Sequence, residues 1–484
     1  MIPCGWSFDN SYARLPEVLF TRLAPSPVRD PRLVILNEPL GQRLGLNFSS
    51  MSSQALAELF AGNRLPTGAD PLAQAYAGHQ FGHFTMLGDG RAIVLGEQMA
   101  PDGKRFDIQF KGSGRTPYSR NGDGRAALGP MLREYIISEA LHALGIPTTR
   151  SLAVVTTGEW VFRGTPLAGA ILTRVASSHL RVGTFQYLAM RRETGVLNRL
   201  VDYALERHYP SSRGGNAAMA LLSGVMERQA ALVIEWLRVG FVHGVMNTDN
   251  MAISGESIDF GPCAFMDVFQ RGTVFSSIDQ TGRYAFANQP GITQWNCARF
   301  AESLLPLLHP DPVMAAGMAQ EAIDGLASLL QTRWLSMMRA KLGLAGEEAG
   351  DAGLIGDLLD WMEERSADYT RTFRSLAAET LPDDSLFRDA PFLAWQRRWL
   401  QRLEANPGGR KAGRAHMLDV NPAVIPRNHK VEEAINAAVL AEELTPLHDL
   451  LAALAHPYED QPSLEPYTRL PESAQRVYKT FCGT

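Results

Sequence analysis

The spacing of apolar residues changes along the chain. Between residues 92 and 174, short apolar runs alternate with polar positions and are separated by glycine-containing turns, which predicts β-strands. From Leu197 onward, apolar residues recur every three or four positions, which predicts amphipathic helices. Residues 1 to about 70 mix turns with short helical segments. The chain is therefore predicted to be an α+β protein in which a strand-rich part precedes a helical part.

The same patterns set bounds for individual elements. A glycine- and aromatic-rich segment, 78–84, leads into the turn 87–91 and is expected to form a hairpin. The expected strands are Ala92–Gly96, Phe106–Lys111, Leu152–Val155, Trp160–Phe162 and Ala168–Arg174. The expected helices are Gln54–Phe60, Leu128–Leu144, Ala217–Val239, Arg299–Leu305 (stopping before Pro306) and Ile323–Leu342, and 404–411 is expected to be a solvated basic loop.

Composition narrows the class of protein. The 484 residues are 45% hydrophobic and 20% charged, as in soluble globular proteins, and the net charge of −5 argues against broad nucleic-acid binding. No apolar run is long enough to span a membrane, and no secretory signal is recognisable. The cysteines, Cys4, Cys263, Cys297 and Cys482, form no metal-binding spacing. We therefore expect a cytoplasmic protein in a reducing compartment, or a mitochondrial one only if the source is eukaryotic.

One stretch, 241–262, carries the densest group of candidate metal ligands. It reads FVHGVMNTDNMAISGESIDFGP and is expected to form two short strands whose polar ends face one another. Asp249, Asn250 and Asp259 supply side-chain oxygens, which suit Mg²⁺ together with substrate phosphates. Turn preference alone could also explain these residues, so their spacing has to decide.

That spacing follows the catalytic loop of protein kinases. Kinases carry His-Arg-Asp, four further residues and a metal-binding Asn, and an Asp-Phe-Gly lies downstream. Here His243 and Asn250 have the same separation, and an Asp-Phe-Gly begins at Asp259. The position of the catalytic Asp is occupied by Val245, which cannot accept a proton. Asp249 is the nearest replacement as a base.

A lysine that ends a strand has two possible carboxylate partners. Lys111 closes the strand 106–111 and could contact nucleotide phosphates while pairing with a helix carboxylate. The helix 128–144 offers Glu134 and Glu139. Periodicity places Glu139 within the apolar face and Glu134 opposite it, and a buried carboxylate needs a partner. Periodicity alone therefore selects Glu139.

Phosphate contacts are also expected from a turn and two arginines. The turn 87–91 could bring backbone N–H groups to a phosphate, with Arg91 supplying charge, although the turn taken alone favours an ordinary tight hairpin. Arg174 and Arg181 flank a polar turn. They could clamp a phosphate or form weak surface pairs, and the sequence leaves these alternatives open.

Taken together, the motifs resemble the SelO (YdiU) family of kinase-like protein adenylyltransferases, and the match runs from end to end. The motifs that carry the resemblance are FDNSYARLP, GHQFGHF, LGDGRA, QFKGSGRTPYSRNGDGRAALGPMLREYIISEA, HGVMNTDNM, IDFGP, GRYAFANQPGITQWN and NPAVIPRN. Members have a protein-kinase-like, two-lobed fold with added helical segments. They are pseudokinases that bind ATP in an inverted orientation and transfer AMP to hydroxyl side chains of proteins.

The resemblance assigns roles to particular residues. It implies that Asp249 is the proton acceptor, that Asn250 and Asp259 bind Mg²⁺, and that Glu134 rather than Glu139 pairs with Lys111. The implied nucleotide contacts are Gly88, Gly90, Arg91, Lys111, Asp123, Gly124, Glu134, Arg174, Arg181 and Asp259. The implied regions are 1–70 (N-terminal extension), 71–165 (N-lobe), 166–320 (C-lobe with the catalytic motifs) and 321–484 (helical extension and tail).

The resemblance also implies partners. These are ATP, with UTP used by some members, Mg²⁺ or Mn²⁺, and proteins with Ser, Thr or Tyr hydroxyls, including redox proteins, but neither nucleic acid nor membrane. Cys482 corresponds to a redox-accessible residue near the C-terminus in the family. A protein kinase with a displaced base and a nucleotide-binding scaffold without chemistry are the alternative functions.

Overall fold

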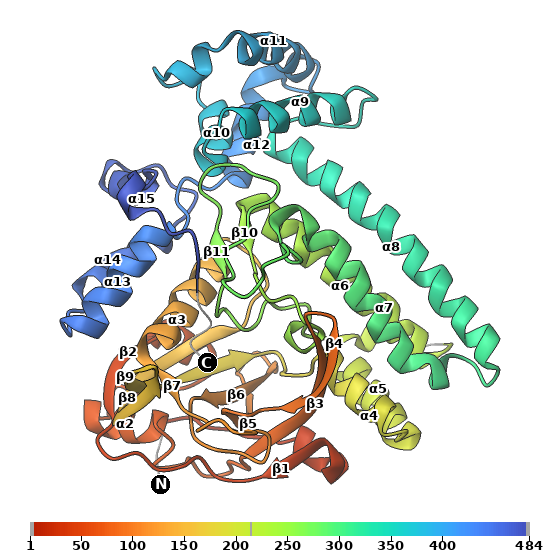
Figure 1. Cartoon of the computed structure of the whole chain (residues 1–484), viewed down its shortest axis with the longest axis vertical. Coiled ribbons are helices and arrows are strands. Elements are labelled where there is room, and N and C mark those ends of the chain that lie inside the picture. The colour runs from red at the N-terminus through yellow and green to blue at the C-terminus, as the bar shows by residue number, and fades with distance from the viewer. Residues whose placement is uncertain (1–3, 213–214, 481–484) are drawn as a thin grey trace.

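A large antiparallel sheet forms one end of the molecule (Figure 1). The computed structural model describes residues 4–212 and 215–480. The sheet has nine strands in the order β1-β3-β5-β6-β9-β8-β2, with β4 paired to β3 and β7 to β9. The strands are β1 (Phe20–Arg22), β2 (Arg32–Leu36), β3 (Leu72–Gln80), β4 (His83–Gly88), β5 (Ala92–Met99), β6 (Arg105–Lys111), β7 (Ala126–Ala127), β8 (Arg150–Arg163) and β9 (Thr165–Ala176).

The five strands predicted between residues 92 and 174 all lie in this sheet, with one correction. The segments expected as two strands, 152–155 and 160–162, belong to the single strand β8, which shifts register between Thr156 and Trp160. Gly158 has a φ of 69° there, so a bulge produced the turn-like signal without ending the strand. The predicted hairpin exists as β3 and β4. The strands β1 and β2 come from 1–70, so the expected boundary at residue 70 falls inside the sheet, and the division into regions stays a prediction.

Alternating side chains of the sheet build two apolar layers. On β9, Leu172 faces α3 (Leu128–Ala143), while Ile171 faces the opposite layer, which contains α2 (Ser53–Phe60). Ser52 caps α2 by accepting a hydrogen bond from the Ala55 N–H, and α1 (Glu38–Arg43) lies in the same layer. The outer side of α3 is covered by α13 (Asn428–Leu440) and α14 (Thr445–Leu454).

A second body consists of helices beside the sheet (Figure 1). It contains α4 (Val182–Met190), α5 (Thr194–His208), α6 (Ala217–Val239), α7 (Gln289–Leu308) and α8 (Pro312–Lys341). Among the described helices, α6 alone is long and apolar enough to cross a membrane, but it packs against α7 and α8, so it is a core helix. The mixture of an antiparallel sheet and many helices confirms the predicted α+β class.

The bounds of two predicted helices and one predicted loop are wrong. The helix α8, expected from Ile323, already begins at Pro312, where Asp311 caps it. The helix α7 was expected to begin at Arg299 and stop before Pro306, but it runs from Gln289 through Pro306 to Leu308. Pro290 in its first turn is a favourable start, and Pro306 lies within three residues of the end, where a kink disturbs little. The expected loop 404–411 is shorter than predicted, because α12 begins at Gly409.

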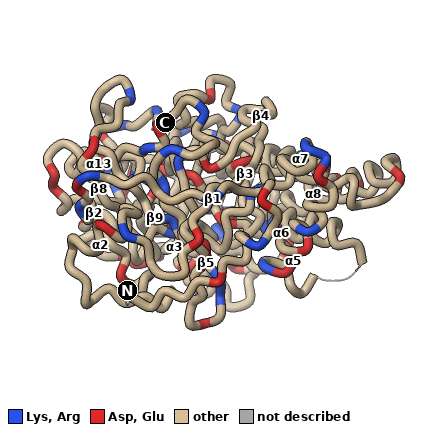
Figure 2. The backbone as a smooth tube through the Cα atoms, turned by 90° about the horizontal axis from the view of Figure 1, so that it is seen from below, with Lys and Arg blue, Asp and Glu red and all other residues tan. Residues whose placement is uncertain are grey.

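Four of the remaining helices form the end of the molecule opposite the sheet, and the short helix α15 is drawn above α13 and α14 (Figure 1). They are α9 (Asp351–Glu364), α10 (Tyr369–Leu376), α11 (Ala390–Glu404), α12 (Gly409–Val420) and α15 (Glu465–Thr468). Seen from the sheet end, acidic and basic positions are interspersed along the backbone rather than separated by sign (Figure 2).

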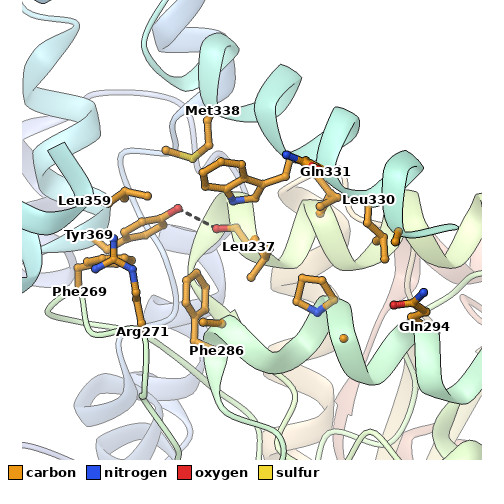
Figure 3. A pocket seen from close by; sticks show the side chains of 16 residues that line it. Leu237, Phe269, Arg271, Phe286, Gln294, Leu330, Gln331, Met338, Leu359 and Tyr369 are labelled. Atoms are coloured by element: carbon orange, nitrogen blue, oxygen red, sulfur yellow. Dashed lines mark hydrogen bonds between the residues drawn. The ribbon is translucent and has the colours of Figure 1, made fainter. Parts of the chain in front are cut away.

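An apolar cavity of about 430 Å³ lies where α6, α7, α8 and α9 meet (Figure 3). Its walls are aromatic and aliphatic side chains, among them Phe286, Leu330, Trp334 and Met338. The Tyr369 hydroxyl donates a hydrogen bond to the Leu237 carbonyl at 2.9 Å, so it is satisfied. None of the residues predicted to be functional lines this cavity.

The central stretch 241–262 differs from its predicted form. The strand β10 (Phe241–Val242) pairs with β11 (Ala264–Phe265), which lies beyond the stretch, and residues 251–253 make only an isolated bridge between Ala252 and Arg181. Between them, Thr248–Asn250 forms a 3₁₀ turn. The expected pair of facing strands is therefore wrong, since most of the stretch is irregular backbone pressed against the sheet.

Candidate active site

A cleft of about 840 Å³ opens between the sheet and the irregular segment after β10. All but one of the predicted site residues line it, the exception being Glu134, which is buried behind Lys111. The predicted residues that line it are Gly88, Gly90, Arg91, Lys111, Asp123, Gly124, Arg174, Arg181, Asp249, Asn250 and Asp259.

Three cations and two carboxylates meet at the inner wall of the cleft. The Lys111 Nζ lies 2.6 Å from Glu134 and 2.8 Å from Asp259. Arg174 donates to Glu134 through Nε at 2.7 Å and to Asp259 through Nη2 at 2.6 Å. Arg181 donates to the other oxygen of Asp259 at 2.6 Å. The cluster therefore carries one more positive charge than negative.

The charged side chains of this cluster are buried, which costs free energy of solvation and strengthens their interactions with one another. Lys111, Arg174 and Arg181 are 6%, 1% and 3% exposed. Burial acts to raise the pKa of Asp259, but Arg174, Lys111 and Arg181 overcome that effect and hold the pKa well below its usual range. Asp259 is thus an anion in the absence of ligand. Its backbone has a φ of 66°, a left-handed conformation that costs free energy in a residue other than glycine.

The partner of Lys111 is Glu134, and the periodicity argument for Glu139 is wrong. Glu139 instead accepts hydrogen bonds from Arg150 at 2.8 and 2.6 Å and from the Asn37 side chain at 2.7 Å. The argument assumed that α3 buries a single face. Glu134 lies on the side of α3 that faces the sheet, where Lys111 on β6 and Arg174 on β9 bind it, and α13 packs against a different side, where Glu432 pairs with Arg133.

Asp249 is a buried carboxylate with an unused oxygen. It is 6% exposed, and its Oδ1 has no hydrogen-bond partner among the described residues. Burial raises its pKa to about 6, against the opposing effect of Arg181. Its backbone carbonyl accepts a hydrogen bond from Arg181 at 2.6 Å. Gly78 faces this carboxylate so closely that any Cβ there would collide with it, which explains the glycine on β3.

Val245 and Asn250, the other two positions that correspond to the kinase catalytic loop, also line the cleft. Val245 occupies the position of the kinase base, and its apolar side chain is 7% exposed. The Asn250 side-chain amide donates to the Val245 carbonyl at 2.9 Å. Because the amide nitrogen is used in this bond, the Asn250 oxygen is the end that can bind a cation.

The glycines of the 87–91 turn are needed for packing. A Cβ on Gly88 or Gly90 would collide with Tyr118. Tyr118 belongs to a loop that also lines the cleft. In the same loop, Asp123 accepts two hydrogen bonds from Arg163 at 2.8 Å each, and this pairing lowers its pKa to about 2. Gly124 has a φ of 70°. Turn and loop are therefore fitted to each other before any ligand binds.

Sequence reasoning missed three residues that shape the cleft. Asp89 is buried in the glycine turn, accepts a hydrogen bond from the Gln74 N–H at 3.0 Å, and has its pKa raised by burial to about 6. Gln109 joins Asp89 to Arg174 through its amide. The Tyr76 ring lies under Arg181, 4.9 Å from the guanidinium carbon. Only Gln109 gave a signal, as a polar residue inside a buried strand.

The described C-terminal end lies beside the stretch 241–262. Thr480 bridges to Ser276, and its hydroxyl donates to the Pro262 carbonyl at 2.6 Å. Cys482, predicted to be redox-accessible, lies outside the described residues. The other cysteines, Cys4, Cys263 and Cys297, are buried.

Comparison with known proteins gives the class and then the family. The model of the family described as "Protein adenylyltransferase SelO" matches residues 4–455. The chain is 59% identical over 481 residues to "Protein nucleotidyltransferase YdiU" of Nitrosococcus oceani, which covers 99% of this chain and 98% of that protein. Proteins with the same name from Bacillus cytotoxicus and Geobacillus kaustophilus are 58% and 59% identical over 481 residues, covering 99% of this chain and 98% and 99% of their own.

These matches make the chain an enzyme, a protein nucleotidyltransferase. It belongs to the SelO/YdiU family of protein adenylyltransferases, and the resemblance drawn from the motifs is confirmed.

Proposed function

We propose that the protein transfers AMP from ATP to the hydroxyl groups of Ser, Thr or Tyr side chains, in a protein-kinase-like cleft that takes the triphosphate inward. The observation that carries this proposal is the buried cluster of Lys111, Arg174 and Arg181 around Asp259. Guanidinium forks match phosphate oxygens in pairs, and a buried excess of positive charge favours the most charged part of a ligand. The adenosine end then lies toward the open side of the cleft.

The kinase-like fold rests on three relations. Lys111 ends a sheet strand and pairs with a carboxylate on the helix α3, and Asp259 opens an Asp-Phe-Gly segment that faces this pair across the cleft. A kinase uses the same three groups to hold its nucleotide. The absence of an acid at Val245 argues against ordinary phosphate transfer, because the usual base is missing at that position.

The proposed reaction balances with the groups present. The oxygen of the acceptor hydroxyl attacks the α-phosphorus of ATP, the bond between the α- and β-phosphates breaks, and pyrophosphate leaves toward the cationic cluster. Asp249, which lines the cleft, accepts the hydroxyl proton on its carboxylate. Arg181 links the two ends of this path, because it binds both Asp259 and the Asp249 carbonyl.

The residues present also fit a divalent cation. Asn250 and Asp259 offer oxygens in the cleft, and Asp249 lines the same cleft beside Asn250. Such a set suits Mg²⁺, with Mn²⁺ as the alternative. When bound, the cation would neutralise phosphate charge. Asp259 accepts hydrogen bonds from Lys111 and Arg174 at Oδ1 and from Arg181 alone at Oδ2, so Oδ2 keeps an acceptor position for the cation.

Labelled nucleotides test the proposal. Purified protein is incubated with acceptor proteins and ATP carrying the label at the α- or the γ-phosphate. We expect protein labelling from the α-position alone, and none with Asp249→Asn. Labelling from the γ-position would make the protein a kinase with a displaced base, and binding without labelling would make it a scaffold. UTP labelled at the α-phosphate tests UMP transfer in the same assay, and acceptors from redox pathways test the predicted redox link.

A further inference from the structure

The motif GRYAFANQPGITQWN has no role in the nucleotide cleft, yet it builds a surface next to it. Trp295 projects from α7, and its ring lies 5.3 Å from that of His79 on β3. His79 in turn contacts Phe84 on β4 at 5.1 Å. Two guanidinium groups lie over Trp295, Arg283 at 4.7 Å and Arg299 at 5.2 Å. We call these five residues the acceptor platform.

The acceptor platform is braced against the turn that carries the proposed base. The Tyr284 hydroxyl, next to Arg283, donates to the Asn247 side chain at 2.6 Å. The His79 N–H donates to the Thr248 hydroxyl at 2.7 Å. The hairpin of β3 and β4 thus holds the turn before Asp249 from one side, and the segment before α7 holds it from the other. A ligand on the platform would therefore be a neighbour of the catalytic turn.

The platform does not belong to the nucleotide. None of its five residues lines the cleft, whereas Phe81 and Asn247, which lie between platform and base, do. The nucleotide cleft also has its own cations. A surface that adjoins the base but lies outside the nucleotide cleft is suitably placed for the second substrate.

Charge indicates what the platform binds. Arg283 has no carboxylate within 4 Å among the described residues, and its Nε is buried without a hydrogen-bond partner. The nearby carboxylate of Asp279 is used by the backbone N–H groups of Arg283 and Tyr284. Arg299 is paired with Glu302 at 2.6 Å. Among the described residues, Arg283 is therefore the platform cation without a carboxylate partner, and its guanidinium carbon lies 4.7 Å from the centroid of the Trp295 ring.

We propose that the acceptor platform binds the polypeptide substrate, with Arg283 pairing with an acidic side chain that flanks the target hydroxyl and Phe84, 39% exposed, contacting an apolar neighbour. This inference rests on the proposed function, because it assumes that a polypeptide is the acceptor. It names the substrate class as segments in which a Ser, Thr or Tyr is followed or preceded, at a constant offset, by Asp or Glu. Complementary charge across such an interface selects partners.

A peptide array tests the inference. Peptides with one Tyr, Thr or Ser and a single Glu or Lys at each flanking position are labelled from α-labelled ATP. We expect wild-type protein to label the best Glu peptide about tenfold faster than its Lys counterpart. Arg283→Glu should reverse this preference, Arg283→Gln should remove it, and Arg283→Lys should keep part of it. Arg388→Glu, the same reversal at an exposed site on another part of the chain, is the matched control.

A second measurement does not depend on catalysis. Fluorescent versions of the best Glu and Lys peptides, with Ala in place of the target residue, are titrated onto nucleotide-loaded protein. Tighter binding of the Glu peptide that Arg283→Glu reverses supports the inference, even where labelling is slow. Equal binding of both peptides, or a preference unchanged by Arg283→Glu, overturns it. Peptide labelling without a charge preference overturns the platform alone, whereas failure of every protein and peptide to be labelled from the α-phosphate overturns the proposed function.

Discussion

The proposed nucleotide cleft and the apolar cavity beside α8 differ in the chemistry of their walls, which are charged in the cleft and apolar in the cavity. The inner wall of the cleft of about 840 Å³ buries three cations around Asp259 and Glu134, and the carboxylates of Asp89 and Asp249 are buried beside them. The cavity of about 430 Å³ is walled by aromatic and aliphatic side chains, and the Tyr369 hydroxyl there is satisfied. The single charge at the cavity, Arg271, is paired with Glu363 and Asp360.

The difference separates a site from a packing defect. Burying an ion costs several kcal/mol, which pairing only partly offsets, so a buried cluster with excess positive charge is a poor way to stabilise a fold. The same cluster is well suited to an anionic ligand, because its charges are fixed before the ligand arrives. Removing the apolar side chains of the cavity wall from water stabilises the fold, and this stabilisation requires no ligand. Substitutions in the cleft should therefore change activity, and those around the cavity should change stability.

The largest effect is expected from Asp259→Ala. This change removes a proposed metal ligand and the anion shared by Lys111, Arg174 and Arg181. Transfer of AMP should fall by at least about 10²-fold, the loss typical when a group that stabilises transition-state charge is removed. Circular dichroism should show a folded protein. Wild-type activity at low Mg²⁺ would contradict both the metal assignment and the role of the cluster.

The next effect should appear in stability alone. Leu330→Ala removes a buried side chain from α8 at the cavity wall. Leucine-to-alanine changes in cores cost about 2–5 kcal/mol, and a wall that already borders a void should lie toward the lower end. Chemical denaturation measures the loss, while AMP transfer per folded molecule should stay at the wild-type rate. A change in ATP affinity beyond about twofold, or about 0.4 kcal/mol, would show that the cavity is coupled to the cleft.

Arg174→Gln should have a smaller effect that depends on the ligand. If the cluster takes the terminal phosphates, each lost charge-assisted contact should weaken ATP binding by about 1.5–3 kcal/mol and AMP binding by much less. Calorimetric titration with both nucleotides measures the difference. Because Arg174 also binds Glu134, a thermal melt is needed to show that the variant is folded. Equal losses for ATP and AMP would place Arg174 away from the terminal phosphates and remove the main support for the inverted orientation.

The periodicity of apolar residues predicted the strands and helices of both regions. It did not predict which segments, far apart in the sequence, pack against one another. The strands around Lys111 and the helices α3 and α6 were predictable because each buries a face with its own period. The choice between Glu134 and Glu139 was not, because both face the sheet side of the fold: Glu134 meets Lys111 and Arg174, and Glu139 meets Arg150, and only the order of the strands decides which lysine or arginine each one reaches. Family resemblance supplied the correct partner of Lys111, where periodicity supplied the wrong one.

The cleft was predictable as a set of residues and only partly as a geometry. Motif spacing indicated Asp249, Asn250 and Asp259, and all three line the same cleft, although their roles stay predictions. No sequence signal showed that Asp259 would be shared by three cations, or that Tyr76 would lie under Arg181. These contacts join β3, β6, β9 and the segment after β10, and their closeness follows from the order of strands in the sheet, which local patterns do not encode.

The smallest effect is expected at the rim of the cleft, where Arg163 holds Asp123. The pair has two bonds of 2.8 Å, but the side chains are 23% and 44% exposed, and exposed pairs contribute less than about 1 kcal/mol. Arg163→Met should therefore lower the free energy of unfolding by less than about 1 kcal/mol at pH 7.

The pH dependence of this difference has a defined sign. Arg163 lowers the pKa of Asp123 to about 2, so the pair contributes fully above the unfolded-state pKa, near 4, and its contribution is lost as the pH falls toward 2. Urea unfolding of both proteins between pH 7 and pH 3 should show the difference shrinking below about pH 4. A loss above about 2 kcal/mol at pH 7 would mean that the rim behaves like the buried cluster. In that case the contrast with the apolar cavity would hold for the whole cleft, including its mouth. It would not be limited to the inner wall of the cleft.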